Sequence, residues 1–290
     1  MELNKRIGVS PWVWGELIGR DDIAIIDKAH ALGFASLEVA VLQLDAFDLE
    51  AVGAALTRTG VTPIVSTAFP EERDLVHANP EYHRNGQDFL RYCVDVAVKL
   101  GADRIIGPFC AAPGRLWVAS AAQKEQEFER AVNNLKPVAA YAHEHGIRLA
   151  LEVLNRYESS FINTAEDGMR LAEAVGSPAF GLLLDTFHMN IEEKSVAAAI
   201  ARAGPHLHHV HAIENDRGIP GSGQVDWAGL GDALHRIDYQ GWIVIEGFTD
   251  QVDWLARAIS MWRPFAPDMN QLAGEGLAFL QATFTVRGAR

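Results

Sequence analysis

The sequence predicts an α/β protein folded as a (β/α)8 TIM barrel, with a single domain over residues 1–290 and an extra C-terminal helical segment. Apolar runs of strand length alternate eight times with segments of helical periodicity, which is the pattern of parallel βαβ units. Eight such units in 290 residues fit one barrel. A doubly wound open sheet is the alternative, but it usually has about five to seven strands, and no strand–helix turn here carries G-x-G-x-x-G.

The helical segments of the first half each end at a glycine, which favours the left-handed conformation that closes a helix. The expected strands are residues 6–10, 36–41, 63–68 and 104–108. The expected helices are residues 22–32, 48–59, 80–100 and 124–145, followed by Gly33, Gly60, Gly101 and Gly146.

The second half repeats the pattern. The expected strands are residues 148–154, an apolar run from residue 180 that turns polar at Asp185, and residues 207–212 and 242–247. The expected helices are residues 165–175, 196–203, 226–237 and 253–262, with Asp226 as an N-cap. A further helix over residues 269–283 lies beyond the eighth unit.

The composition narrows the range of partners. The formal net charge of −13 argues against nucleic acid and against an anionic membrane, because both require a basic surface. It favours a neutral small molecule over a phosphorylated one. Two cysteines are too few for a disulfide framework. Residues 1–10 lack the apolar segment of a signal peptide, and no apolar run is long enough to span a bilayer, so we expect a cytoplasmic protein.

Four consecutive strands end in side chains of metal-ligand type. These are Glu152, Asp185, His211 and Glu246. In a TIM barrel the chemistry lies at the C-terminal ends of the strands. Alternation supports an inward direction: Trp242, Val244 and Glu246 share one face of the last strand, and His209 shares the face of His211.

Three carboxylates and an imidazole aimed at one point would repel each other and raise each other's pKa values, and a divalent cation removes that conflict. A single strand-end carboxylate is more often a helix cap or a salt-bridge partner, but four in succession favour a shared cation. Three oxygens and one nitrogen, without a thiolate, favour Mn²⁺, Co²⁺ or Mg²⁺ over structural zinc.

The positions of the two glutamates suggest a reaction. Glu152 and Glu246 end strands three steps apart, about 135° around the barrel axis, so they would face a bound sugar from roughly opposing sides. A metal-bound ketone acidifies its neighbouring C–H bond. One glutamate could remove that proton and the other could return one to the opposite face, which is epimerisation by general acid–base catalysis.

At these residues the chain resembles the D-tagatose/D-psicose (D-allulose) family of ketose 3-epimerases. The matching blocks are L-E-V-L-N-R-Y-E (151–158), L-D-T-F-H-M-N-I-E-E (184–193), H-V-H-A-I-E-N-D-R-G-I-P-G-S-G-Q-V-D-W (209–227) and I-V-I-E-G-F (243–248). The similarity spans the barrel and is concentrated from residue 148 onward. The D-T-F-H-M-N-I-E-E run is its most specific part.

The resemblance implies that the four strand-end residues bind the metal and that Glu152 and Glu246 double as the acid/base pair. It also implies that Glu158, His188 and Arg217 hold the O1–O3 end of a ketose. Members usually use Mn²⁺ or Co²⁺ and act on free ketoses as homodimers or homotetramers. Without the resemblance, Glu158 and Arg217 would read as solvated surface residues, and His188 as a capping residue.

The wall that would meet C4–C6 of the sugar departs more from the family pattern. It contains V-S-T-A-F (65–69) and G-P-F-C-A-A-P (107–113), and we expect Ser66 and Gly107 to line the pocket. Trp14, after the first strand, and Phe248, after the last, are further wall candidates, although core packing would also explain them.

The leading hypothesis is therefore a metal-dependent ketose 3-epimerase acting through a cis-enediolate. An aldose–ketose isomerase or an inosose dehydratase-like lyase could use the same barrel and metal site. A metallonuclease of the endonuclease IV type would need more histidine ligands and a basic groove. A non-catalytic sugar-binding barrel would have no reason to keep two such carboxylates at one metal.

Overall fold

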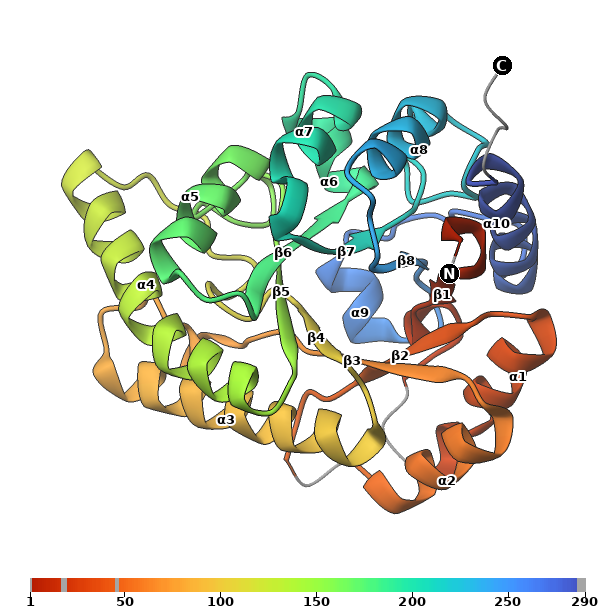
Figure 1. Cartoon of the computed structure of the whole chain (residues 1–290), viewed down its shortest axis with the longest axis horizontal. Coiled ribbons are helices and arrows are strands. Elements are labelled where there is room, and N and C mark those ends of the chain that lie inside the picture. Colours follow the sequence, from red (N-terminus) through yellow and green to blue (C-terminus); the bar gives the residue numbers. More distant parts are fainter. Residues whose placement is uncertain (1, 17–19, 45–46, 286–290) are drawn as a thin grey trace.

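The computed structural model describes residues 2–16, 20–44 and 47–285, and its eight strands form one closed parallel barrel in chain order (Figure 1). The predicted (β/α)8 fold is confirmed. The strands are β1 (Ile7–Val9), β2 (Ser36–Ala40), β3 (Thr62–Ser66), β4 (Arg104–Gly107), β5 (Arg148–Glu152), β6 (Phe180–Asp185), β7 (Leu207–His211) and β8 (Trp242–Ile245). Several are shorter at the C-terminal end than predicted, and Glu246 lies one residue beyond β8.

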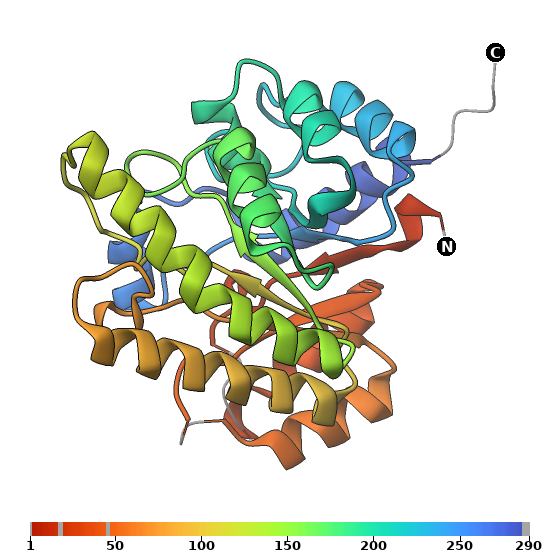
Figure 2. The same ribbon diagram turned by 60° about the vertical axis from the view of Figure 1, so that its left-hand side comes forward.

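Helices surround the barrel, and the two longest, α3 and α4, pack side by side on its outer surface (Figure 2). The helices are α1 (Ala24–Leu32), α2 (Leu49–Thr59), α3 (Pro80–Leu100), α4 (Ala121–Glu144), α5 (Ala165–Val175), α6 (Thr186–Glu192), α7 (Val196–Ala203), α8 (Trp227–Arg236), α9 (Asp253–Ala258) and α10 (Met269–Thr283). Short 3-10 turns are η1 (Leu3–Lys5), η2 (Pro11–Val13), η3 (Arg20–Asp22), η4 (Glu71–Arg73) and η5 (Gly204–His206).

The helices differ most from the prediction in three places. Helix α4 begins at Ala121, three residues early, because Ser120 and Gln123 form a capping box that starts it. The closing helix α9 ends at Ala258 instead of residue 262. Helix α6 was not predicted, since its seven residues follow a strand without any intervening loop.

Side chains alternate between the barrel interior and the helical layer. Ile64, Ile106, Ala150, Leu183 and Val244 come from five strands and form a small buried cluster of their own inside the barrel. Ile243 and Ile245 belong to the larger core between strands and helices. The predicted facing of the last strand is therefore confirmed, and it aims the residues after Val244 into the barrel mouth.

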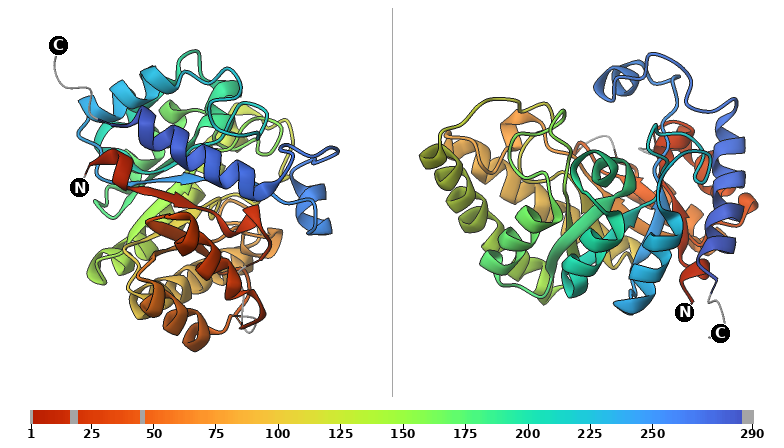
Figure 3. Two further views of the ribbon diagram at one scale, coloured as in Figure 1. Left: turned by 90° about the vertical axis from the view of Figure 1, so that its right-hand side faces the viewer. Right: turned by 90° about the horizontal axis from the view of Figure 1, so that it is seen from above.

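The last two helices of the chain lie at different parts of the barrel. Helix α10 packs beside η1 and β1, whereas α9 stands over the end of the barrel where the strands terminate (Figure 3). Leu255 and Ala258 of α9 line the cavity there. Within the described residues, none of the helices combines the length and apolarity that a membrane crossing requires.

Truncation of the interior cluster should destabilise the fold. Leu183 is completely buried, so Leu183→Ala should lower the free energy of unfolding by about 2–5 kcal/mol, through lost burial and the cavity left behind. Urea unfolding followed by circular dichroism measures the change. Val98 on α3 is 47% exposed, and Val98→Ala should stay within about 0.5 kcal/mol of the parent. Equal effects of the two variants would contradict this account of the core.

Candidate active site

The four strand-end residues converge at the mouth of the barrel. Glu152 ends β5, Asp185 ends β6, His211 ends β7, and Glu246 follows β8. One ligand atom from each lies within 4.8 Å of the other three, and all four side chains are buried. Because Asp185 is the register partner of His211, neighbouring strands present these two at the same height. The structure thus brings together the quartet identified in the sequence.

The donor atoms of this quartet fit a divalent cation. His211 Nε2 lies 2.9 Å from Glu38 Oε1, whereas its Nδ1 is buried and has no hydrogen-bond partner among the described residues. That nitrogen lies 3.4 Å from Glu246 Oε1 and 3.7 Å from Glu152 Oε1. A buried nitrogen left unpaired beside carboxylates is costly unless it has a ligand, and O₃N donors suit Mn²⁺, Co²⁺ or Mg²⁺.

Asp185 serves two neighbours with its two oxygens. Its Oδ1 accepts a 2.7 Å hydrogen bond from the backbone N–H of Phe187 and caps α6. Its Oδ2 faces the site, 3.4 Å from Arg217 Nη1 and 3.9 Å from His188 Nε2. The capping role and the ligand role are therefore compatible, because each uses a different oxygen.

The two glutamates have opposite electrostatic environments. Burial raises the pKa of Glu246 to about 8; the charges of Glu152 and Asp185 add to the rise, and His211 and Arg217 oppose it. Burial also acts to raise the pKa of Glu152, but hydrogen bonding and charge from His188 and His211 outweigh it and hold that pKa well below its usual range. Paired carboxylates whose pKa values are pushed apart are typical of acid/base catalysis.

Arg217 supplies buried positive charge next to the quartet. Its guanidinium lies 2.6 Å from Glu246 Oε2, 3.4 Å from Asp185 Oδ2 and 3.7 Å from Glu158 Oε1. The group is only 4% exposed and stacks on Phe187 and Phe248, with its central carbon 4.0 and 4.8 Å from the two ring centroids. Packing between two rings fixes the plane of the donors.

The loop after β7 that carries Arg217 is held by a buried carboxylate. Glu214 accepts hydrogen bonds from the backbone N–H groups of Gly221 and Val225 and from the indole N–H of Trp227, at 2.8–3.0 Å. Arg217 itself has a positive φ of 67°. These contacts fold the loop against the site.

His188 presents one defined nitrogen to the site. Its Nδ1 lies 2.8 Å from the side-chain Nδ2 of Asn155 and 3.3 Å from its backbone nitrogen, and both are donors. The Asn155 orientation is set by its Oδ1, which accepts from Tyr157 N, and its Nδ2 also reaches Glu158 at 3.0 Å. In the neutral ring the proton therefore lies on Nε2, 3.5 Å from Glu152 Oε1.

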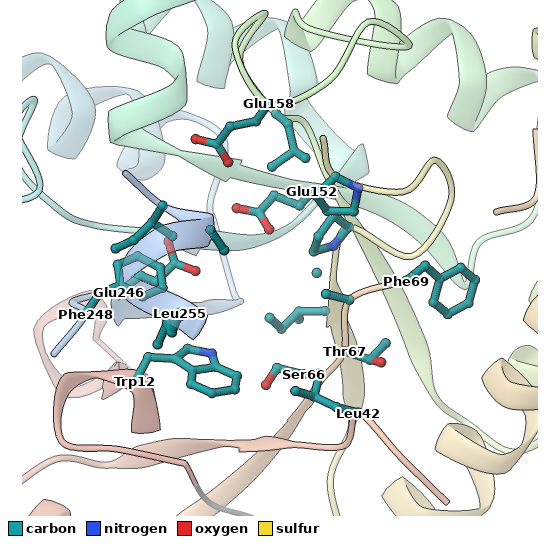
Figure 4. Close-up of a pocket in the computed structure, with 18 of the residues that line it drawn as sticks. Trp12, Leu42, Ser66, Thr67, Phe69, Glu152, Glu158, Glu246, Phe248 and Leu255 are labelled. Carbon is teal, nitrogen blue, oxygen red and sulfur yellow. The ribbon is translucent and has the colours of Figure 1, made fainter. Parts of the chain in front are cut away.

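A cavity of about 540 Å³ opens above these residues. Figure 4 shows the carboxylates of Glu152 and Glu158 on one side and Trp12, Leu42 and Ser66 across from them. The full wall also includes Glu38, Phe69, Gly107, Pro108, His188, His211, Arg217, Glu246, Phe248, Trp254, Leu255 and Ile259, among others. This size is typical of small-molecule sites.

Three of the four residues named as wall candidates line this cavity, namely Ser66, Gly107 and Phe248. Trp14 does not: it packs against the core, and its indole N–H donates to Asn270 Oδ1. Trp12, which lies in the η2 turn after β1, takes that place. Glycine is required at residue 107, where a Cβ would lie 2.1 Å from the Thr67 carbonyl oxygen.

Sequence reasoning missed two residues of the site. Glu38 lies on β2, in a strand of five buried residues, and an ionisable residue within such a strand was a usable signal. Asn155 belongs to the L-E-V-L-N-R-Y-E block but was given no role. Nothing in the sequence around Asn155 indicates that it would contact His188, 33 residues away.

Known proteins place the chain in a family. A family model described as xylose isomerase-like TIM barrel matches residues 26–283. A probable ketose 3-epimerase from Synechocystis sp. is 33% identical, covering 96% of both chains. An L-ribulose 3-epimerase from Methylomonas sp. is 32% identical over 90% of this chain and 91% of its own. A crystal structure of D-allulose 3-epimerase from Methylomonas sp. has a TM-score of 0.90 at 31% identity, covering 96% of this chain and 97% of that one.

The chain therefore belongs to the xylose isomerase-like TIM barrel family. The resemblance stated from the sequence motifs is confirmed, since its relatives are named ketose 3-epimerase, L-ribulose 3-epimerase and D-psicose 3-epimerase. The protein is an enzyme of the isomerase class, an epimerase.

Cation binding should strengthen as the pH rises. To bind a cation, the quartet would need Glu246 ionised and His211 Nδ1 free of a proton. The pKa of Glu246 is raised to about 8, and Glu246 and Glu38 raise that of His211 well above its usual value in spite of burial. Both groups therefore release protons on binding below pH 8. Mn²⁺ affinity should increase between pH 6 and pH 8, by up to about tenfold per pH unit for each proton released.

Isothermal titration calorimetry in two buffers of different ionisation enthalpy counts the released protons directly. An affinity that does not change between pH 6 and pH 8, with no proton release, would contradict the electrostatic account of the quartet.

Proposed function

We propose that the protein epimerises free ketoses at C3 in a reaction that depends on a divalent cation. The observation that carries the proposal is the placement of two glutamates with opposed pKa shifts, Glu152 and Glu246, within one cluster of four side chains of metal-ligand type. The names of the relatives support the same reaction at C3.

Glu152, Asp185, His211 and Glu246 would hold the cation. When bound, it would supply Lewis-acid stabilisation of negative charge on the ketose oxygens. We propose Mn²⁺ as the resident ion, with Co²⁺ and Mg²⁺ as alternatives that suit the same oxygen-rich donors. We also propose, as the sequence predicts, that the protein is cytoplasmic and forms a homodimer or a homotetramer.

The two glutamates would carry the proton transfers. Their strands, β5 and β8, are three steps apart in the closed barrel, so their carboxyl groups approach a ligand in the mouth from different sides. One carboxylate removes the proton from C3 and leaves a cis-enediolate, and the other delivers a proton to the opposite face of the same carbon. The configuration at C3 is thereby inverted.

Three further residues would hold the O1–O3 end of the ketose. The fixed guanidinium of Arg217 can donate to enediolate oxygens, and His188 can donate from its Nε2–H. Glu158 is partly exposed at the edge of the cavity and can accept from a hydroxyl group. These roles leave the apolar part of the wall for C4–C6.

The rest of the cavity wall mixes apolar and polar side chains. Leu42, Phe69, Pro108, Phe248 and Leu255 offer apolar contact area, and Gln43, Ser66, Thr67 and Arg73 add polar groups. We therefore propose a substrate class, which includes D-tagatose, D-fructose with D-psicose, and L-ribulose.

Isotope exchange tests this reaction. Mn²⁺-loaded protein is incubated with each of these ketoses in D₂O, and the position of deuterium is read by NMR. We expect label at C3 together with appearance of the 3-epimer. Label at C1 or C2 alone would indicate aldose–ketose isomerisation. Label at C4 would indicate a 4-epimerase, such as the Escherichia coli relative with 28% identity, and loss of water from the sugar would indicate a lyase. Each of these outcomes would refute epimerisation at C3.

The same assay tests the role of Glu246. Glu246→Gln should reduce exchange at C3 by about 10³-fold or more, because an amide cannot transfer the proton. Glu275→Gln, exposed on α10, is the matched control and should behave as the parent. Full exchange by a correctly folded Glu246→Gln protein would show that the two-glutamate mechanism is wrong.

Replacement of the stacked arginine should also be costly. Lysine at residue 217 keeps the charge but loses the planar donors and the stacking on Phe187 and Phe248, so kcat/KM should fall by about 10²-fold. Arg263 provides the control, because it is exposed and forms an ion pair with Asp216, the residue before Arg217. Steady-state kinetics should show Arg263→Lys unchanged, and equal kinetics for both variants would contradict the role given to Arg217.

A further inference from the structure

A carboxylate on the far side of the barrel contacts the proposed metal ligand His211. Glu38 lies in the middle of β2, faces the interior together with Ser36, and is 1% exposed. Strands β2 and β7 are three steps apart in the closed barrel, so Glu38 meets β7 across the interior. A carboxylate buried to this extent requires partners.

Its partners are the two histidines of β7 that point inward. Glu38 Oε1 lies 2.9 Å from His211 Nε2 and 3.3 Å from His209 Nε2, and both rings are at most 1% exposed. The two imidazoles are nearly perpendicular, at 85°, with centroids 5.3 Å apart. One carboxylate oxygen is thus shared by two rings that stand one above the other along the strand.

The contact to His211 determines which of its nitrogens is available. A carboxylate accepts, so Nε2 must carry the proton that it donates to Glu38. In the neutral ring Nδ1 then holds a free lone pair. This is the nitrogen that has no hydrogen-bond partner among the described residues and that faces Glu152 and Glu246.

We propose that Glu38 is a positioning residue for the metal site. It holds His211 in the Nε2–H tautomer, fixes the ring so that Nδ1 points to the carboxylates, and increases the basicity of Nδ1 through a charged hydrogen bond. His209 is the second contact that keeps Glu38 in place. This inference rests on the proposed cation site, and a partner of this kind typically changes metal affinity by about 10–100-fold.

Two substitutions separate charge from geometry. The side-chain oxygen of Gln in Glu38→Gln can still accept from His211 Nε2 but carries no charge. In Glu38→Ala both the acceptor and the charge are lost. Ser36→Ala is the matched control, because Ser36 is equally buried on the same face of β2 and its hydroxyl has no hydrogen-bond partner among the described residues.

The primary readout is Mn²⁺ affinity, measured by calorimetry and by the EPR signal of free Mn²⁺. Affinity should fall about tenfold in Glu38→Gln and up to about 100-fold in Glu38→Ala, while Ser36→Ala binds as the parent. With Co²⁺, the visible absorption spectrum should shift in both Glu38 variants. In the epimerase assay, the Mn²⁺ concentration for half-maximal activity should rise, with the KM for ketose little changed at saturating Mn²⁺.

Small carboxylates provide a rescue experiment. Glu38 borders the cavity, so formate can reach the space left in Glu38→Ala and should restore part of the Mn²⁺ affinity. It should have no such effect on the parent or on Ser36→Ala. If Glu38→Ala does not fold, the affinity and Co²⁺ spectrum of Glu38→Gln decide the matter alone.

Several results would overturn the inference. Parental Mn²⁺ affinity and an unchanged Co²⁺ spectrum in the Glu38 variants would show that Glu38 acts only in packing. Two ions per parent chain, reduced to one in Glu38→Ala, would show instead that Glu38, His209 and His211 form a second metal site. A parent protein that binds no divalent cation would refute the proposed cation site itself, a failure distinct from the other two.

Discussion

Buried negative charge at the mouth of the barrel is the constraint on which the rest of the site depends. Glu152, Asp185 and Glu246 lie in one cluster, and each is at most 8% exposed. Parallel strands closed into a ring necessarily aim their last residues at a common point, so the fold itself creates the repulsion. The positive charge of Arg217 offsets part of this repulsion, and the donor atoms that it does not contact suit a cation.

The positively charged and imidazole side chains beside these carboxylates are held in place by further polar contacts. Glu214 fixes the loop of Arg217, Asn155 fixes the ring of His188, and Glu38 contacts the ring of His211. Asn155 and Glu38 come from segments distant in the chain, Glu214 belongs to the same loop as Arg217, and all three are buried. Precise placement of a few charged groups therefore depends on side chains that need never touch a substrate.

The barrel and the quartet could be predicted because their signals are local and repeat with a fixed period. Alternation along β8 placed Val244 inside and Ile243 outside, which fixed the direction of Glu246 two residues later. Helix α5 matched its prediction at both ends, since Thr164 caps its start and Gly176, with φ of 69°, closes it. The same local rules hold wherever a helix has a clear start and stop.

What the sequence did not reveal depends on contacts between distant residues or on short turns. Glu38 finds its partner 173 residues away, and no local pattern reports such a pairing. Trp12 and Trp14 could not be told apart, because the η2 turn, which contains Trp12 and ends just before Trp14, breaks the alternation of the strand. Helix α6 is too short to show a helical period, and its cap is the last residue of a strand.

The double use of Asp185 limits how this region can change in length. A helix turns by about 100° per residue, so His188, three residues after the cap, returns to nearly the same side as Asp185. Insertion or deletion of one residue between them would turn the imidazole away from the cavity while leaving the helix cap intact. The placement of His188 therefore requires that the interval from residue 185 to residue 188 keep its length.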